Sequence, residues 1–187
     1  MPRRYDSSRR KKAAEQTRDG ILRVALKLHW EGVTEFEPLA REAECSLATV
    51  RKHFPTKEAL YRSCTQTFGK TLTLPDLEAL SRIQDQSERL TQCMSELCRI
   101  HEAMFGYAWH SAYLRQDSPV LDAVMRNYEE LADAVANTIT PKDSSRAPTV
   151  RGLVDFLTYR ALRLSGNLSP VQVKTELVTT ISRLIGA

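Results

Sequence analysis

Residues 34–60, TEFEPLAREAECSLATVRKHFPTKEAL, are the stretch of sequence that decides the fold. The spacing of Thr34 and Glu37 matches a capping box, in which each side chain binds the other residue's backbone N–H in the first turn of a helix. This spacing predicts a short helix that carries Leu39 and Ala40 on its inner face. The helix is expected to end near residues 44–45.

A second helix is expected directly after this one. Ser46 is a suitable N-cap for a helix over residues 47–54, because its hydroxyl can accept a hydrogen bond from a free backbone N–H. Pro55 prevents that helix from continuing, and Thr56 is suited to begin a third. Two short helices joined by a tight turn predict a helix-turn-helix motif, whose second helix enters the major groove of DNA.

The side chains of residues 47–54 suit DNA binding. Val50 and Phe54 lie four positions apart and are expected to face inward. Small and basic residues are left for the outer face, where they can approach base edges or donate hydrogen bonds to phosphates. With the residue that begins the next helix included, the candidate DNA contacts are Ala48, Thr49, Arg51, Lys52, His53 and Lys57. An ordinary solvated helix face is the alternative interpretation.

Positive charge is concentrated at the N-terminal end of the chain. The 187 residues include 27 Lys or Arg and 23 Asp or Glu, a net charge of +4. Residues 1–70 carry a balance of +6, and residues 71–187 carry −2. Residues 1–12 are therefore predicted to form a disordered basic arm that contacts DNA phosphates or the minor groove, with a solvated tail as the alternative. The predicted contacts of this arm are Arg9, Arg10, Lys11 and Lys12.

The remainder of the chain has a helical pattern. Apolar residues recur every three or four positions, and no convincing stretch alternates with a period of two. Ser118-Pro119 and Ser169-Pro170 each indicate the start of a helix. Only 7 glycines are present, and no glycine-rich phosphate-binding motif is found. The sequence predicts an all-α fold of roughly nine helices.

Soft and aromatic side chains gather in the second half of the chain and predict a pocket for an apolar small molecule. The candidate lining residues are Met94, Cys98, His101, Phe105, Trp109, Tyr128, Phe156 and Tyr159. Plain core packing is the alternative for each of them. Cys98 and His101 could share a helix face, but two side chains do not make a zinc site. Neither a metal nor a cofactor is therefore expected.

A longer pattern surrounds the helix-turn-helix motif. It runs through Thr17-Arg18-x-x-Ile21-Leu22, Ala25-Leu26-x-Leu28, Glu31-Gly32, Leu39-Ala40-x-x-Ala43-x-Cys45-Ser46-x-Ala48-Thr49-Val50 and His53-Phe54-x-x-Lys57-Glu58-x-Leu60. This pattern covers roughly a quarter of the chain and resembles the DNA-binding domain of TetR-family transcriptional regulators. By this resemblance, the expected base contacts are Leu47, Ala48, Thr49 and Lys52. The expected phosphate contacts are Thr34, Arg51, His53 and Lys57, with the cap residue Ser46 in the same interface.

The resemblance also implies how the whole chain is organised. Residues 13–60 would form a three-helix DNA-binding domain, and residues 61–187 a helical ligand-binding and dimerisation domain. Members of the family are typically homodimers through their last two helices, which are expected here at residues 148–166 and 169–185. A ligand in a pocket among the middle helices weakens operator binding.

Two positions depart from the pattern of the family. Arg51 stands where the recognition helix usually has a Tyr, so its role stays open between a phosphate and a base contact. Glu44 stands where the turn commonly has a Gly, and a carboxylate there opposes DNA binding unless it points outward.

The sequence therefore predicts a repressor that binds a palindromic double-stranded DNA operator and is released by a small, largely apolar effector. The alternative is an all-α small-molecule-binding protein or enzyme with an incidental helix-turn-helix-like segment. An enzyme is not expected, because G-x-S-x-G, H-E-x-x-H and paired Glu-x-x-His motifs are all missing. No secretory signal, membrane-spanning apolar run or C-x-x-C spacing is visible, so we expect a cytoplasmic protein that has no membrane partner.

Overall fold

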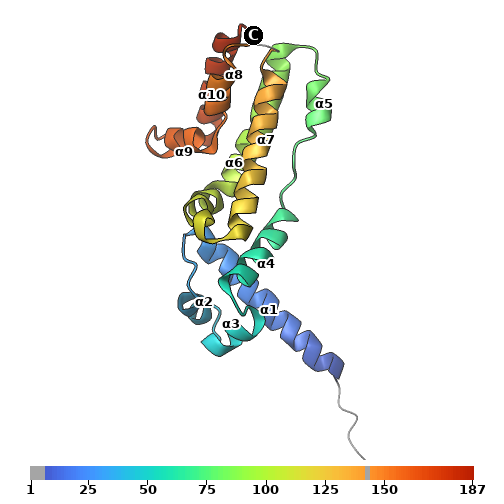
Figure 1. Ribbon diagram of the computed structural model, residues 1–187, viewed down its shortest axis with the longest axis vertical. Coiled ribbons are helices and arrows are strands. Elements are labelled where there is room, and N and C mark those ends of the chain that lie inside the picture. Colours follow the sequence, from blue (N-terminus) through green and yellow to red (C-terminus); the bar gives the residue numbers. More distant parts are fainter. Residues whose placement is uncertain (1–6, 142–143) are drawn as a thin grey trace, which may run out of the picture.

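A computed structural model describes residues 7–141 and 144–187 (Figure 1). These residues form ten α-helices, one short 3-10 helix and no strand, which confirms the predicted all-α fold. The helices are α1 (Ser7–Trp30), α2 (Phe36–Glu42), α3 (Leu47–His53), α4 (Lys57–Gly69), α5 (Leu77–Ser81), α6 (Gln86–Leu114), η1 (Arg115–Asp117), α7 (Pro119–Ile139), α8 (Ala147–Leu153), α9 (Phe156–Leu164) and α10 (Pro170–Ile185).

Four predicted N-caps are confirmed. The hydroxyls of Ser46, Thr56, Ser118 and Ser169 each accept a hydrogen bond from a backbone N–H three residues further on. At Ser169 the capping box is complete, because the Gln172 side chain also accepts from the backbone N–H of Ser169. These caps fix where α3, α4, α7 and α10 begin.

The predicted capping box at Thr34 and Glu37 is wrong. The N-cap of α2 is Glu35, whose side chain makes no capping hydrogen bond, and the helix begins at Phe36. Phe36 is buried in the core of the N-terminal helices. Burying a Phe side chain contributes about 1.5–3 kcal/mol, more than a typical side-chain cap, so packing outweighs the local signal.

The predicted helix over residues 148–166 is also wrong, since two helices occupy this range. α8 ends at Leu153, and Asp155 begins α9 by accepting a hydrogen bond from the N–H of Leu157. Val154, between the two helices, is fully buried. The new N-cap and the buried residue at the break explain why the chain forms two helices. The sequence predicted one helix because the apolar spacing continues without interruption across the break.

The disordered arm that the sequence predicts at residues 1–12 is contradicted for its second half. Residues 7–12 are the first residues of α1, and residues 1–6 lie outside the described part of the chain. Residues 9–14 are Arg, Lys and Ala, which all have high helix propensity. They let α1 extend beyond the part that packs against the N-terminal core. The predicted domain boundary after residue 12 therefore falls inside a helix.

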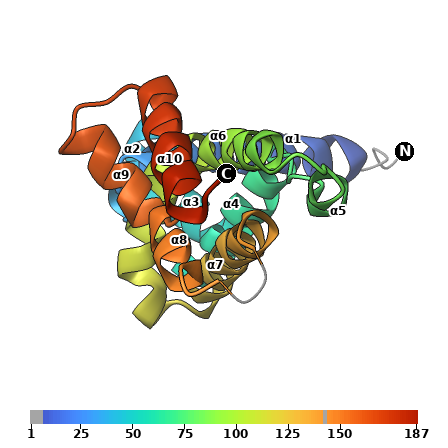
Figure 2. The ribbon, with the colours of Figure 1, turned by 90° about the horizontal axis from the view of Figure 1, so that it is seen from above.

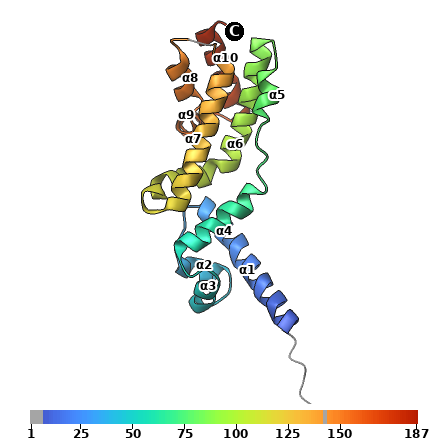
Figure 3. The ribbon, with the colours of Figure 1, turned by 45° about the vertical axis from the view of Figure 1, so that its right-hand side comes forward.

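Helices α1–α4 form an N-terminal unit with its own apolar core. Ile21 of α1, Leu39 of α2, Val50 of α3 and Leu60 of α4 are all buried in this core. The predicted boundary after residue 60 lies inside α4, since α4 continues from this core toward the rest of the chain. Figure 3 shows α2 and α3 together at one end of the molecule, beside α1.

Helices α5–α10 form the body. The long helices α6 and α7 pack along each other, with α10 and α9 against α6 and α5 against both (Figure 2). A cluster around Ile100, Met104 and Tyr128 also takes in Phe68 at the end of α4, so α4 joins the N-terminal unit to the body. Within the described residues, no helix is both long and apolar enough to cross a membrane.

Candidate DNA interface and ligand cavity

Helix α3 has the orientation that its sequence predicts. Val50 and Phe54 are fully buried against the N-terminal core. The side chains of Ala48, Arg51 and Lys52 are exposed on the opposite face. A helix with a basic, sterically open outer face can approach the major groove of DNA.

The remaining predicted residues of α3, Leu47, Thr49 and His53, are only partly exposed, whereas the N-cap Ser46 is exposed. Leu47 packs against the core of the N-terminal unit. Thr49 and Ser46 form one polar pair at the start of the helix, because their hydroxyl oxygens lie 2.8 Å apart and the N–H of Thr49 donates to Ser46 Oγ over 3.1 Å. His53, in the last turn, is half-buried.

The turn between α2 and α3 is held by backbone hydrogen bonds. The N–H of Cys45 donates to the carbonyl of Ala40, and the N–H of Glu44 donates to the carbonyl of Arg41. This is the Schellman pattern, in which the residue after the C-cap adopts a left-handed conformation. Glu44 does so, with a φ of 49°, and its side chain is exposed.

Ion pairs and stacking hold the cations near this interface. Lys57 Nζ lies 2.5 Å from Glu35 Oε1 on the surface, so DNA phosphates would compete with Glu35 for this cation. The Arg51 guanidinium lies 5.9 Å from the ring centroid of Phe36. This contact places the Arg51 guanidinium beside the first residue of α2.

Two other parts of the predicted interface lie away from α3. Arg9, Arg10, Lys11 and Lys12 are exposed on the first turns of α1, which projects beyond α2 and α3 (Figures 1 and 3). Thr34 lies just before α2 and lines a cavity.

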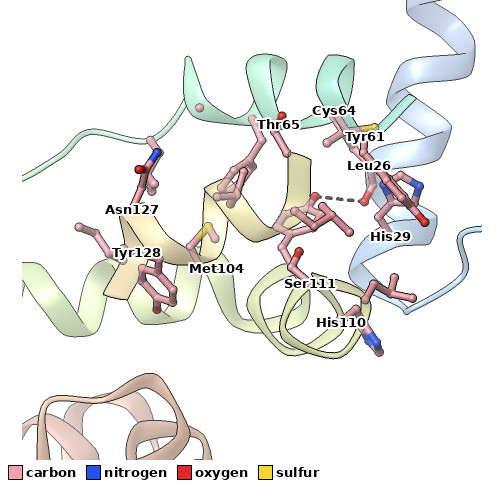
Figure 4. A pocket seen from close by; sticks show the side chains of 18 of the residues that line it. Leu26, His29, Tyr61, Cys64, Thr65, Met104, His110, Ser111, Asn127 and Tyr128 are labelled. Atoms are coloured by element: carbon pink, nitrogen blue, oxygen red, sulfur yellow. Dashed lines mark hydrogen bonds between the residues drawn. The ribbon is translucent and has the colours of Figure 1, made fainter. Parts of the chain in front are cut away.

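That cavity, called here the main cavity, has a volume of about 280 Å³ and lies where the N-terminal unit meets the body (Figure 4). Its walls come from four helices and from the segments that follow α1 and α4. The lining residues are Leu26, His29, Thr34, Tyr61, Cys64, Thr65, Phe68, Gly69, Leu72, Leu74, Ile100, Met104, Tyr107, His110, Ser111, Leu114, Leu121, Val124, Asn127, Tyr128 and Leu131. Leu74 is also exposed, so the cavity reaches the surface beside the segment after α4.

The titratable side chains of the main cavity are held in their uncharged forms. Burial lowers the pKa of His29 to about 4 and lowers that of His110, to which the charge of Arg160 also contributes. Burial raises the pKa of the Cys64 thiol to about 12. At neutral pH the cavity wall is therefore uncharged at these positions.

Only Tyr128 among the eight side chains predicted to line a pocket lines the main cavity. Met94 and Cys98 lie in the core that α6 makes with α7, α8 and α10. Tyr159 is fully buried and donates a hydrogen bond of 2.7 Å to Glu102. Trp109 is 42% exposed and lies under the Arg160 guanidinium, 3.6 Å from the ring centroid.

A small cavity of about 120 Å³ contains three of the predicted residues, His101, Tyr128 and Phe156. Phe105 packs edge-on against Phe156 near it. The prediction thus placed most of the lining residues on the face of α6 that meets α9 and α10. Apolar spacing shows which faces are buried but not which helix covers them.

The prediction missed every residue that α1, α4 and α6 contribute to the main cavity, and those of α7 other than Tyr128. His29, in the last turn of α1, and Tyr61 of α4 make an edge-on contact with ring centroids 5.5 Å apart. Polar side chains on otherwise apolar helix faces could have indicated these lining residues in the sequence. The prediction did not use this signal, because it divided the chain into separate domains and the cavity lies between them.

No group of three or more potential metal ligands is found among the described residues. All four cysteines are free thiols.

The comparisons with known proteins concern the fold. The sequence matches no protein-family model, and no curated protein matches it. The solved structure of the multidrug binding protein EbrR in complex with imidazole has a similar fold, with a TM-score of 0.51 and 20% sequence identity. The match covers 99% of this chain and 94% of that one. This chain therefore shares its all-α fold, over nearly its whole length, with that multidrug binding protein.

Proposed function

We propose that this chain is a ligand-responsive DNA-binding regulator of the TetR family. It binds a palindromic operator as a homodimer and releases it when a small, largely apolar effector occupies the main cavity. The likeness to a multidrug binding protein supports a regulator rather than an enzyme.

One observation carries the proposal. Helix α1, which packs directly against α2, and helix α4, which packs against α1 and shares the core of the N-terminal unit with α2 and α3, also form walls of the main cavity. Leu26 and His29 come from α1, and Tyr61, Thr65 and Phe68 from α4. A ligand that displaces these walls changes the position of the DNA-facing helix, which couples ligand binding to DNA binding.

Exposed apolar residues on α9 and α10 support the proposed dimer. Leu157 and Leu164, 56% and 54% exposed, lie seven positions apart on one face of α9. Val171, at the start of α10, is 69% exposed. Exposed large apolar side chains on two helices in contact are typical of a protein–protein contact. A second copy of the chain would cover them, and light scattering should give the mass of a dimer.

A gel shift tests DNA binding, with DNA from upstream of the encoding gene as the probe. Arg51→Ala and Lys57→Ala should each weaken binding, and loss of a phosphate contact should lower the salt slope by about one. Arg82→Ala is the matched control, because it removes an exposed cation from the C-cap of α5 in the body. Binding that is blind to sequence, or equally affected by all three substitutions, would contradict the proposal and favour a small-molecule carrier.

A further inference from the structure

The main cavity is lined without ionised side chains. Among the described residues around it there is no Asp, Glu, Lys or Arg. Its polar groups are hydroxyls, one amide and the imidazoles of His29 and His110. An ion transferred from water into such a space loses its hydration and gains no counter-charge, which costs several kcal/mol. The lining thus selects against both cations and anions.

The polar groups are not spread evenly over the wall. His29, Tyr61, His110 and Ser111 lie toward the end formed by α1 (Figure 4). Helix α7 contributes aliphatic side chains together with the amide of Asn127 and the ring of Tyr128, whose hydroxyl already pairs with His101. A molecule that fits both ends has an apolar body and a polar group directed toward α1.

His29 is the group best placed to meet that polar end. Its ring is mostly buried and makes no hydrogen bond to any described residue, and its neighbour Tyr61 contacts it only edge-on. Tyr107, which also lines this end, already donates its hydroxyl to the carbonyl of Leu26 over 3.1 Å. A neutral imidazole offers one donor and one acceptor, and a buried ring without partners gains from a ligand that supplies one.

We infer that the main cavity takes an uncharged, mainly apolar molecule with one hydrogen-bonding group, and that His29 binds this group. The inference rests on the proposed function in one respect, namely that the main cavity is the effector site. It adds the charge class of the effector and the residue that reads its polar end. Since His29 belongs to α1, that hydrogen bond ties the ligand directly to the N-terminal unit.

Four probes with one ring system separate the contributions. Naphthalene, 2-naphthol, 2-naphthylmethylamine and 2-naphthoate share the apolar body, and at pH 7 the last two carry a positive and a negative charge. Calorimetric titration should find that 2-naphthol binds about three- to tenfold more tightly than naphthalene. The cation and the anion should bind at least about tenfold more weakly than 2-naphthol.

Two variants test the role of His29. His29→Phe keeps a flat ring but removes both hydrogen-bonding atoms, so 2-naphthol should lose its advantage over naphthalene while naphthalene still binds. His29→Asn keeps a donor and an acceptor and should retain part of that advantage. The affinity of naphthalene itself reports whether the cavity of each variant is intact.

The outcomes separate this inference from the proposed function. Equal binding of 2-naphthylmethylamine and 2-naphthol overturns the inference, as does failure of all four probes to bind. An unchanged advantage of 2-naphthol in His29→Phe overturns the role of His29. The gel shift is independent of these titrations, so a chain that binds 2-naphthol as expected but no operator supports the inference and contradicts the regulator.

Discussion

Glu44 has a backbone conformation that residues with a side chain rarely adopt. A left-handed φ of 49° brings the Cβ of any residue other than glycine close to the backbone, at a cost of about 1–3 kcal/mol. The turn between α2 and α3 needs this conformation, because it directs the N–H groups of residues 44 and 45 to the end of α2. Strain is therefore stored beside the proposed DNA-facing helix.

We expect Glu44→Gly to stabilise the protein by about 1 kcal/mol, since glycine adopts the same turn without steric conflict. In a chain of this length, the melting temperature should rise by about 2–4 °C. Thermal denaturation followed by circular dichroism measures it. Glu44→Ala is the control, because it removes the carboxylate but keeps the Cβ. Equal stabilisation by both substitutions would show that charge, not backbone strain, is the cause.

At the scale of helices, a buried hydrogen-bonded chain joins α6, α7 and the break between α8 and α9. His101 Nε2 lies 3.1 Å from the carbonyl oxygen of Val154, and Nδ1 pairs with the Tyr128 hydroxyl. Burial lowers the pKa of His101 to about 4, so the ring is neutral at pH 7. A carbonyl only accepts, so Nε2 carries the proton and Nδ1 accepts from Tyr128.

Tyr128→Phe should therefore leave Nδ1 of His101 buried without a donor. The expected loss is about 1–3 kcal/mol in the free energy of unfolding, measured by chemical denaturation. Tyr113→Phe is the matched control, because the Tyr113 side chain is 82% exposed on the same helix as His101 and should change stability by less than about 0.5 kcal/mol. If the two variants lost the same stability, the hydrogen bond to His101 would not be the cause.

Helices were easiest to predict from sequence where a capping residue marks the position at which the helix begins. The hydroxyls of Ser46, Ser118 and Ser169 do so, and each caps the expected helix. Asp155 is an equally good cap, but it lies inside a continuous apolar pattern that reads as one helix. The main cavity was harder still, because its position depends on the approach of His29 and Tyr61 to α6 and α7, and helical periodicity carries no information about such contacts.

At the scale of the whole molecule, the N-terminal unit and the body meet through a close joint between α1 and α6. An edge-on contact joins Trp30 to Tyr107, with ring centroids 5.2 Å apart. Gly32 leaves room for the ring of His110, and Gly106 leaves room for the backbone of Trp30. Tyr107 and His110 also line the main cavity, so the joint and the cavity share a wall.

This joint should not tolerate even one added methyl group on α6. A Cβ at position 106 would overlap the carbonyl oxygen of Trp30 and lie 2.8 Å from its Cδ2, and the backbone cannot move aside as a flexible side chain can. We expect Gly106→Ala to lower the free energy of unfolding by about 1 kcal/mol or more, because overpacking exceeds the gain in helix propensity. Gly152→Ala on α8 meets no heavy atom within 4 Å, so it gains helix propensity without overpacking and should be neutral or stabilising. Chemical denaturation compares the two variants. If Gly106→Ala proved as stable as Gly152→Ala, the two units could separate at little cost, and the shared wall could not transmit a ligand's presence to the proposed DNA-facing helix α3.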